Sequence, residues 1–228
     1  EEVLARILQA ENRGLVMMFA RTKRQTQQIA DELEARGFSV AAVHGDVPQQ
    51  GREKALASFR SGKVDVLVAT DVAARGIDVE GVTHVVNVSC PEDEKTYLHR
   101  IGRTGRAGAS GVAVTLVDWE DMARWSAINA ALGLPYPDPP ETYSTSEHLF
   151  HDLGIPPGTT GMMPGVTRAP VEPRSDSGGR RRGSSGGGRS SRGAAPSGSR
   201  SGRSSRNPTG SSTPESAASS GADAAQAG

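Results

Sequence analysis

The chain has 228 residues with 26 basic and 26 acidic side chains, so its formal net charge is zero. The single cysteine, Cys90, excludes a disulfide framework and a cysteine-based zinc site within the chain. No apolar run approaches the roughly 18 residues of a membrane span, so we expect a cytoplasmic protein without membrane contact.

Short apolar runs alternate with amphipathic stretches over the first 135 residues. Runs of strand length lie at residues 15–20, 39–44, 64–70, 84–89 and 111–117. Helical spacing of apolar residues predicts helices at about residues 24–37, 49–62, 92–102 and 120–133. Strands that are apolar throughout, with helices between them, indicate a parallel sheet covered on both faces. We therefore expect one α/β domain over residues 1–135.

The remainder of the chain changes in composition twice. Residues 136–173 contain eight prolines and little periodicity, which favours an extended arm lying on the domain. Residues 174–228 carry nine arginines against three acidic residues, a net charge of +6, and the preceding residues carry −6. Without aromatic residues this Arg/Gly/Ser-rich tail is expected to be disordered. It either associates with RNA by charge or acts as a solubilising linker.

Polar clusters follow three of the predicted strands where each strand ends. They read RTK at residues 21–23, HGD at residues 44–46 and TDVAARGID at residues 70–78. Carboxyl ends of parallel strands meet at one edge of a sheet, where open α/β folds bind ligands. We therefore expect the three clusters to form a single surface.

The segment HRIGRTGRAG at residues 99–108 is a basic cluster, and the question is which anionic group pairs with it. It places His99, Arg100, Arg103 and Arg106 close together in a chain of zero net charge. Like charges at short spacing repel each other, which suggests an anionic partner. Taken alone, such a cluster usually pairs with surface carboxylates.

The HGD, TDVAARGID and HRIGRTGRAG segments, in this order, resemble the second RecA-like lobe of a DEAD-box ATP-dependent RNA helicase over about residues 1–135. The resemblance implies a three-layer RecA-like α/β domain with a mostly parallel sheet. The first lobe's G-x-x-x-x-G-K-[ST] and D-E-A-D motifs do not occur in the sequence. We therefore expect the C-terminal half of an RNA helicase that is inactive alone. Its cofactor would be ATP with Mg²⁺, the magnesium being held mainly by the missing N-terminal RecA-like lobe.

The resemblance also implies roles for individual residues, none of them a metal ligand. Two residues match arginine fingers that stabilise the γ-phosphate during hydrolysis: Arg103 and Arg106. Two match nucleotide contacts: Gly76 and Asp78. Two match positions that couple the lobe to its partner lobe: His99 and Arg100. Four match contacts to RNA phosphates: Thr22, Gly45, Arg52 and Thr70.

Some expectations concern residues outside these motifs. The NVSCP segment at residues 87–91 departs from the Asn-Tyr-Asp-x-Pro that the family often has, so Ser89 replaces an acidic residue. Trp119 and Trp125 are expected to pack the last helix onto the sheet. Two alternative functions are a catalytically silent RNA-binding or scaffold module and a DNA helicase. The intact set of Asp78 and the two finger arginines argues against the first, and His99 argues against the second.

Overall fold

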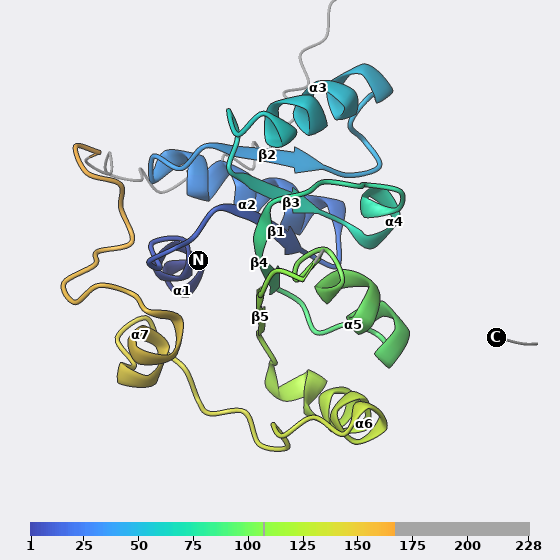
Figure 1. The fold of residues 1–228 in the computed structure, drawn as a ribbon, viewed down its shortest axis with the longest axis vertical. Coiled ribbons are helices and arrows are strands. Elements are labelled where there is room, and N and C mark those ends of the chain that lie inside the picture. Colours follow the sequence, from blue (N-terminus) through green and yellow to red (C-terminus); the bar gives the residue numbers. More distant parts are fainter. Residues whose placement is uncertain (107, 167–228) are drawn as a thin grey trace, which may run out of the picture. The chain divides into compact units, whose positions relative to one another are not determined.

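The computed structural model describes residues 1–106 and 108–166, so the predicted tail at residues 174–228 lies outside the described part. Five strands form one sheet in the order β2-β3-β1-β4-β5, and every pairing between them is parallel (Figure 1). The strands are β1 (Leu15–Phe19), β2 (Val40–Val43), β3 (Val66–Ala69), β4 (Val82–Asn87) and β5 (Val112–Thr115). The predicted parallel sheet is thereby confirmed.

Helices connect the strands and begin at residues suited to that position. They are α1 (Glu2–Ile7), α2 (Lys23–Ala35), α3 (Gln49–Arg60), α4 (Asp71–Ala74), α5 (Glu94–Ile101), the 3₁₀ turn η1 (Trp119–Asp121), α6 (Met122–Leu132) and α7 (Glu147–Leu153). The Asp93 carboxylate accepts the Thr96 N–H at 2.7 Å and so caps α5. Helix α6 ends at Gly133, whose φ of 61° an L side chain adopts only with strain.

The inner strands β1, β3 and β4 are mostly buried and mainly apolar, whereas the edge strands β2 and β5 are largely half-buried or exposed. On β1, Val16 and Met18 pack against α1 and α2, whereas Met17 and Phe19 pack against α3 and α4. This alternation follows from the two-residue period of a strand. The result is the three-layer arrangement of a helix layer, a sheet and a second helix layer.

A smaller apolar cluster fixes α6 against α5. The rings of Tyr97 and Trp125 meet edge to face with centroids 5.9 Å apart, and Cys90 and Ile128 complete the cluster. Trp119 is 86% exposed, so the expectation that both tryptophans pack onto the sheet is wrong for this one. It is the first residue of the η1 turn, which precedes α6.

Beyond residue 136 the chain packs onto the domain and contains a helix, α7, which the proline-rich composition did not predict. Leu149 and Ile155 are buried among α1 and α2 side chains. The Gln9 side chain donates to the Met162 carbonyl at 2.8 Å and accepts the Gly161 N–H at 3.0 Å. None of the helices in residues 1–106 and 108–166 is long and apolar enough to cross a membrane.

Candidate functional site

The three polar clusters lie at the carboxyl edge of the sheet and are joined by contacts between them. Lys23 Nζ lies 2.8 Å from Asp46 Oδ2, which links the turn after β1 to the turn after β2. The hydrogen bond from Lys23 holds the pKa of Asp46 below its usual value. Arg52 Nη2 donates to the Ala73 carbonyl at 2.7 Å and so links α3 to α4. The first two clusters are therefore joined directly, and the third is joined to the helix that follows the second.

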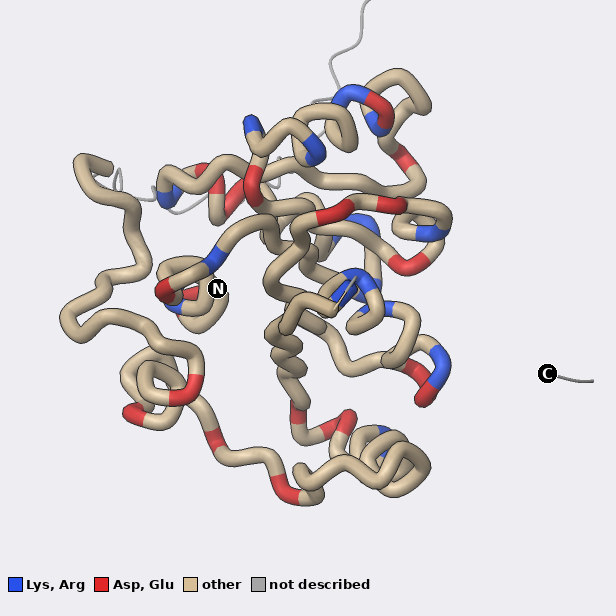
Figure 2. Tube along the Cα trace, viewed as in Figure 1, with Lys and Arg blue, Asp and Glu red and all other residues tan. Residues whose placement is uncertain are grey.

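A pocket of about 430 Å³ opens at this edge between α4 and α5. Its lining residues are Phe19, Asp71, Ala74, Arg75, Gly76, Thr96, His99, Arg100 and Arg103. Three arginines face one aspartate, so the lining carries net positive charge. Figure 2 shows basic residues on the α5 side of the molecule and mainly acidic residues along the segment from η1 to α7.

Arg100 lies inside the chain, with only 3% of its side chain exposed. Its Nη1 donates to the Ser89 carbonyl at 2.8 Å and to Asn87 Oδ1 at 3.2 Å, while the rest of the guanidinium binds Asp71. Its Cζ also lies 5.3 Å from the centroid of the Phe19 ring. Within this lobe Arg100 is therefore a positioning residue that fixes the start of α4, and its coupling to a partner lobe stays a prediction.

The two predicted finger arginines fold back onto the chain. Arg103 Nη1 donates to the Ile77 carbonyl at 2.7 Å, and its Nε donates to the His99 carbonyl at 3.1 Å. Arg106 donates to the Asp78 carboxylate and, through Nε, to the Gly102 carbonyl at 2.9 Å. The side chains of Arg106 and Asp78 are 37% and 82% exposed, so water screens this ion pair.

Backbone geometry around Gly76 explains why glycine occupies this position. Its φ is +72°, and a Cβ there would meet no atom within 4 Å. The requirement for glycine is therefore conformational and not steric. The turn brings Ile77, whose carbonyl holds Arg103, and Asp78, which holds Arg106, to the same edge.

The predicted RNA-contacting residues differ in whether they already make hydrogen bonds within the chain. The Thr22 hydroxyl accepts the Gln25 N–H at 3.2 Å as the cap of α2. The Thr70 hydroxyl makes no hydrogen bond with any residue that the structure describes. Gly45 is exposed, and a Cβ added to it would meet nothing within 4 Å. Arg52 is already bound to the α4 backbone, which makes it a positioning residue in this conformation.

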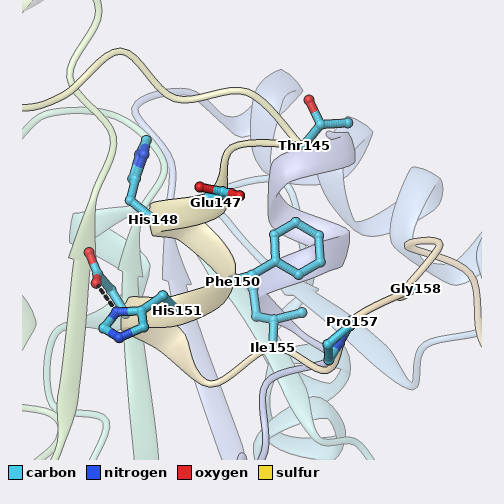
Figure 3. A pocket seen from close by; sticks show the side chains of 9 residues that line it. Thr145, Glu147, His148, Phe150, His151, Ile155, Pro157 and Gly158 are labelled. Atoms are coloured by element: carbon cyan, nitrogen blue, oxygen red, sulfur yellow. Dashed lines mark hydrogen bonds and ion pairs between the residues drawn. The ribbon is translucent and has the colours of Figure 1, made fainter.

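A second pocket, about 740 Å³, lies beside α7 and contains none of the predicted site residues. Figure 3 shows Phe150 and Ile155 on one side of α7 and His148 on the other. His151 Nδ1 lies 2.9 Å from Asp152 Oδ1. Within residues 1–106 and 108–166, no cluster of three histidine, cysteine or acidic side chains is arranged to hold a metal ion.

Known proteins share this fold and these motifs. Residues 1–108 match the family described as helicase conserved C-terminal domain. The ATP-dependent RNA helicase DeaD of Mycobacterium tuberculosis (strain H37Rv) is 50% identical over 130 residues, which are 57% of this chain and 23% of that protein. The crystal structure of the E. coli DEAD-box protein SrmB bound to regulator of ribonuclease activity A is 36% identical, with a TM-score of 0.55 over 57% of this chain and 78% of that one.

This chain belongs to the DEAD-box RNA helicase family. The matched part is the C-terminal RecA-like lobe of that family, as the motifs indicated. S. cerevisiae Dbp5 bound to RNA and ADP BeF3 is also similar, with 37% identity and a TM-score of 0.55 over 58% of this chain and 36% of that one. The chain spans about a quarter of the length of its curated DEAD-box relatives, 23% of DeaD and 26% of CshA from Bacillus subtilis.

The sequence did not single out several polar residues that shape this DEAD-box lobe. Ser89 Oγ donates to Gln25 Oε1 at 3.0 Å and accepts the Arg21 N–H at 3.3 Å. Arg21 Nη2 in turn reaches the Asp121 carboxylate at 2.9 Å. Ser89, the serine that replaces the family's acidic residue, is therefore hydrogen-bonded to both Gln25 and Arg21. Only the departure of NVSCP from the family pattern pointed to Ser89.

Proposed function

We propose that this lobe completes the ATP site of an RNA helicase and holds single-stranded RNA at the same edge of its sheet. Arg103 and Arg106 would reach the γ-phosphate of an ATP bound mainly by an N-terminal lobe. The observation that carries the proposal is the positive pocket between α4 and α5, which Arg103 and Gly76 line; Asp78, two residues after Gly76, is paired with Arg106. The match to DEAD-box helicases supports the same assignment.

The pocket suits a polyphosphate. Its lining has three arginines and one aspartate, and that aspartate is already neutralised by Arg100. Guanidinium groups present planar donors that match phosphate oxygens. When bound, ATP supplies the phosphoanhydride bond whose hydrolysis drives the helicase cycle. Magnesium would be held mainly by the N-terminal lobe.

The pair of Arg106 and Asp78 prepares both side chains for nucleotide. Exposed ion pairs stabilise a protein by at most about 1 kcal/mol, so this pair opens at little cost. Asp78 would then accept hydrogen bonds from the ribose, and Arg106 would turn towards the phosphates. An arginine delivered across an interface accelerates phosphoryl transfer by roughly 10³ to 10⁵.

Apolar residues on the same edge suit contact with a second lobe. Val72 on α4 is 73% exposed and Leu98 on α5 is 48% exposed, on either side of the pocket's helices. Exposed apolar side chains next to a functional pocket favour a protein interface. His99, exposed beside Leu98, would sense the partner lobe directly. Arg100 would act indirectly by holding Asp71 and the start of α4.

RNA would be held by phosphate and sugar contacts that carry no sequence preference. The Thr70 hydroxyl makes no hydrogen bond within the described part of the chain, and Gly45 leaves room for the close approach of a nucleotide. Thr22 contributes through a turn fixed by its own capping bond. The similar Dbp5 structure contains RNA and ADP BeF3, which supports placing both ligands on this kind of lobe.

The deciding experiment measures ATP hydrolysis with and without single-stranded RNA, on this chain alone and after addition of an N-terminal lobe from a related helicase. We expect no turnover alone and RNA-stimulated turnover after addition. RNA binding without turnover in either case would instead indicate a silent binding module. Stimulation by single-stranded DNA equal to that by RNA would indicate a DNA helicase.

A further inference from the structure

Arg21 lies at the carboxyl edge of the sheet, and part of its guanidinium group is already hydrogen-bonded. Its Nη2 lies 3.1 Å from Asp121 Oδ1 and 2.9 Å from Asp121 Oδ2. Its Nε and Nη1 make no hydrogen bond with any residue in 1–106 or 108–166. The side chain is 48% exposed. One part of this half-exposed group is therefore anchored, and the other has no hydrogen-bond partner among the described residues.

Asp121, the residue that anchors Arg21, is buried and forms ion pairs with two arginines. Only 11% of its side chain is exposed, and Arg124 donates to it as well. Two arginines around one carboxylate leave the cluster with one surplus positive charge. Because Arg124 also pairs with Asp121, the Asp121 carboxylate stays neutralised when Arg21 binds a phosphate, and no buried charge is left unpaired.

The backbone of Arg21 is fixed as firmly as its side chain. Its N–H lies 3.2 Å from Gln25 Oε1 and 3.3 Å from Ser89 Oγ. The next residue, Thr22, caps α2 and is one of the proposed RNA contacts. The next cation along the chain, Lys23, is already paired with Asp46. Arg24, which follows Lys23, is exposed and makes no hydrogen bond within the described residues, so what distinguishes Arg21 is its anchor on Asp121 and not its spare donors alone.

We propose that Arg21 binds a phosphodiester of single-stranded RNA through Nε and Nη1, and that Asp121 is the residue that positions it. The proposal rests on the RNA-binding function proposed above and adds a phosphate contact beside Thr22. An arginine fixed at one nitrogen loses less conformational entropy on binding than a free one. Hydrogen bonds between guanidinium and phosphate are charge-assisted and strong.

The role of Asp121 predicts an effect opposite to that of simple electrostatics. Removing a negative charge beside RNA normally strengthens binding, because a repulsion disappears. If Asp121 positions Arg21, however, Asp121→Asn weakens RNA binding. The matched control is Asp118→Asn, which removes an exposed acidic residue three positions earlier in the chain. That variant is expected to bind RNA as tightly as the parent or slightly more tightly.

The experiment measures the affinity of the full chain for a fluorescent oligouridylate over a range of salt concentrations. Arg21→Ala is expected to lower the affinity on the order of tenfold and to reduce the salt slope by about one. Lys63→Ala, an exposed cation remote from this turn in sequence, serves as the control for lost charge. Asp121→Asn should weaken binding in the parent and change nothing when Arg21 is already alanine.

Different results separate the possible failures. Equal affinity of Arg21→Ala and the parent would overturn the contact, and so would a gain of affinity in Asp121→Asn. Thermal unfolding of each variant detects a loss of binding that comes from unfolding. The Arg21 Nε–H resonance is followed separately while the protein is titrated with the oligouridylate. In a folded parent, an Nε–H resonance that RNA leaves unmoved also overturns the contact. No binding by the parent would overturn the proposed function as well, whereas binding that depends on Thr70 but not on Arg21 would overturn this inference alone.

Discussion

The Arg100 guanidinium holds the Asp71 carboxylate through two parallel hydrogen bonds, Nε to Oδ1 and Nη2 to Oδ2, each of 2.7 Å. The two residues come from α5 and α4, which form the walls of the positive pocket. Because Arg100 also binds Asn87 and the Ser89 carbonyl, the pair ties both helices to the end of β4. The geometry of the pocket therefore depends on a contact buried beneath it.

Replacing Arg100 with alanine should destabilise the protein. Asp71 and Asn87 would lose a partner that is 3% exposed, but the Asp71 side chain is itself 38% exposed and water can solvate it, so the loss should be about 1 to 3 kcal/mol. Urea unfolding measures the loss. Arg100→Lys should not restore stability, because lysine lacks the planar fork of donors. Arg75→Ala, an exposed neighbour in the same pocket, is the control, and a similar loss there would refute the special role of Arg100.

Replacing Arg106 with alanine should cut RNA-stimulated ATP hydrolysis of the joined lobes by at least about two orders of magnitude. RNA affinity should change little, because Arg106 faces Asp78 on the nucleotide side. Steady-state ATPase assays and fluorescence anisotropy measure the two quantities. Arg106→Lys should retain little activity, since a point charge does not reproduce the fork. Normal turnover in Arg106→Ala would remove the assignment as an arginine finger.

Gly45→Ala tests the RNA face without disturbing the fold. A Cβ at this position meets nothing within 4 Å and the backbone φ is not positive, so thermal stability should stay within about 0.5 kcal/mol of the parent. RNA binding should nevertheless weaken if a nucleotide approaches this backbone closely. Gly62→Ala, whose φ is +71° in a turn at the other end of α3, should show the reverse: lower stability and unchanged RNA binding.

His84 should make stability depend on pH. It is 4% exposed, and burial, followed by the charge of Arg13, holds its pKa below the usual value of 6.5. The unfolded chain therefore binds a proton before the folded one does. Stability should be constant above about pH 6.5 and fall as the pH drops from there towards the lowered pKa.

Urea unfolding of His84→Asn tests this dependence, because the drop between about pH 7 and about pH 5 should shrink in that variant. His151→Asn is the control, since the His151 side chain is 90% exposed. A drop of equal size in His84→Asn and the parent would assign the pH dependence to other groups.

Removing residues 174–228 should weaken RNA binding and flatten its dependence on salt. The segment carries nine arginines and three acidic residues, and each phosphate contact adds to the salt slope. Affinity measured at several salt concentrations, with and without the segment, gives the difference. An unchanged slope would show that the segment is a linker.

The periodicity of the sequence determined the sheet and its functional edge. Strands buried on both faces must be apolar throughout, and parallel strands must place their carboxyl ends together, so the RTK, HGD and TDVAARGID segments were bound to meet. The motifs also identified the DEAD-box lobe, since their order and spacing are specific. Composition did not predict α7, whose packing relies on Leu149 and Ile155 fitting a surface made by α1 and α2.

Tertiary structure alone decided which partner each long side chain takes. Arg100 turned inward to Asp71, Arg106 took Asp78, and Arg21 reached Asp121, which lies 100 residues away along the chain. An arginine's charge is local information, but its partner depends on the distances between segments that meet only in the folded chain. Periodicity therefore sets where an arginine stands, and the packing of remote segments sets whether it is free to bind a phosphate.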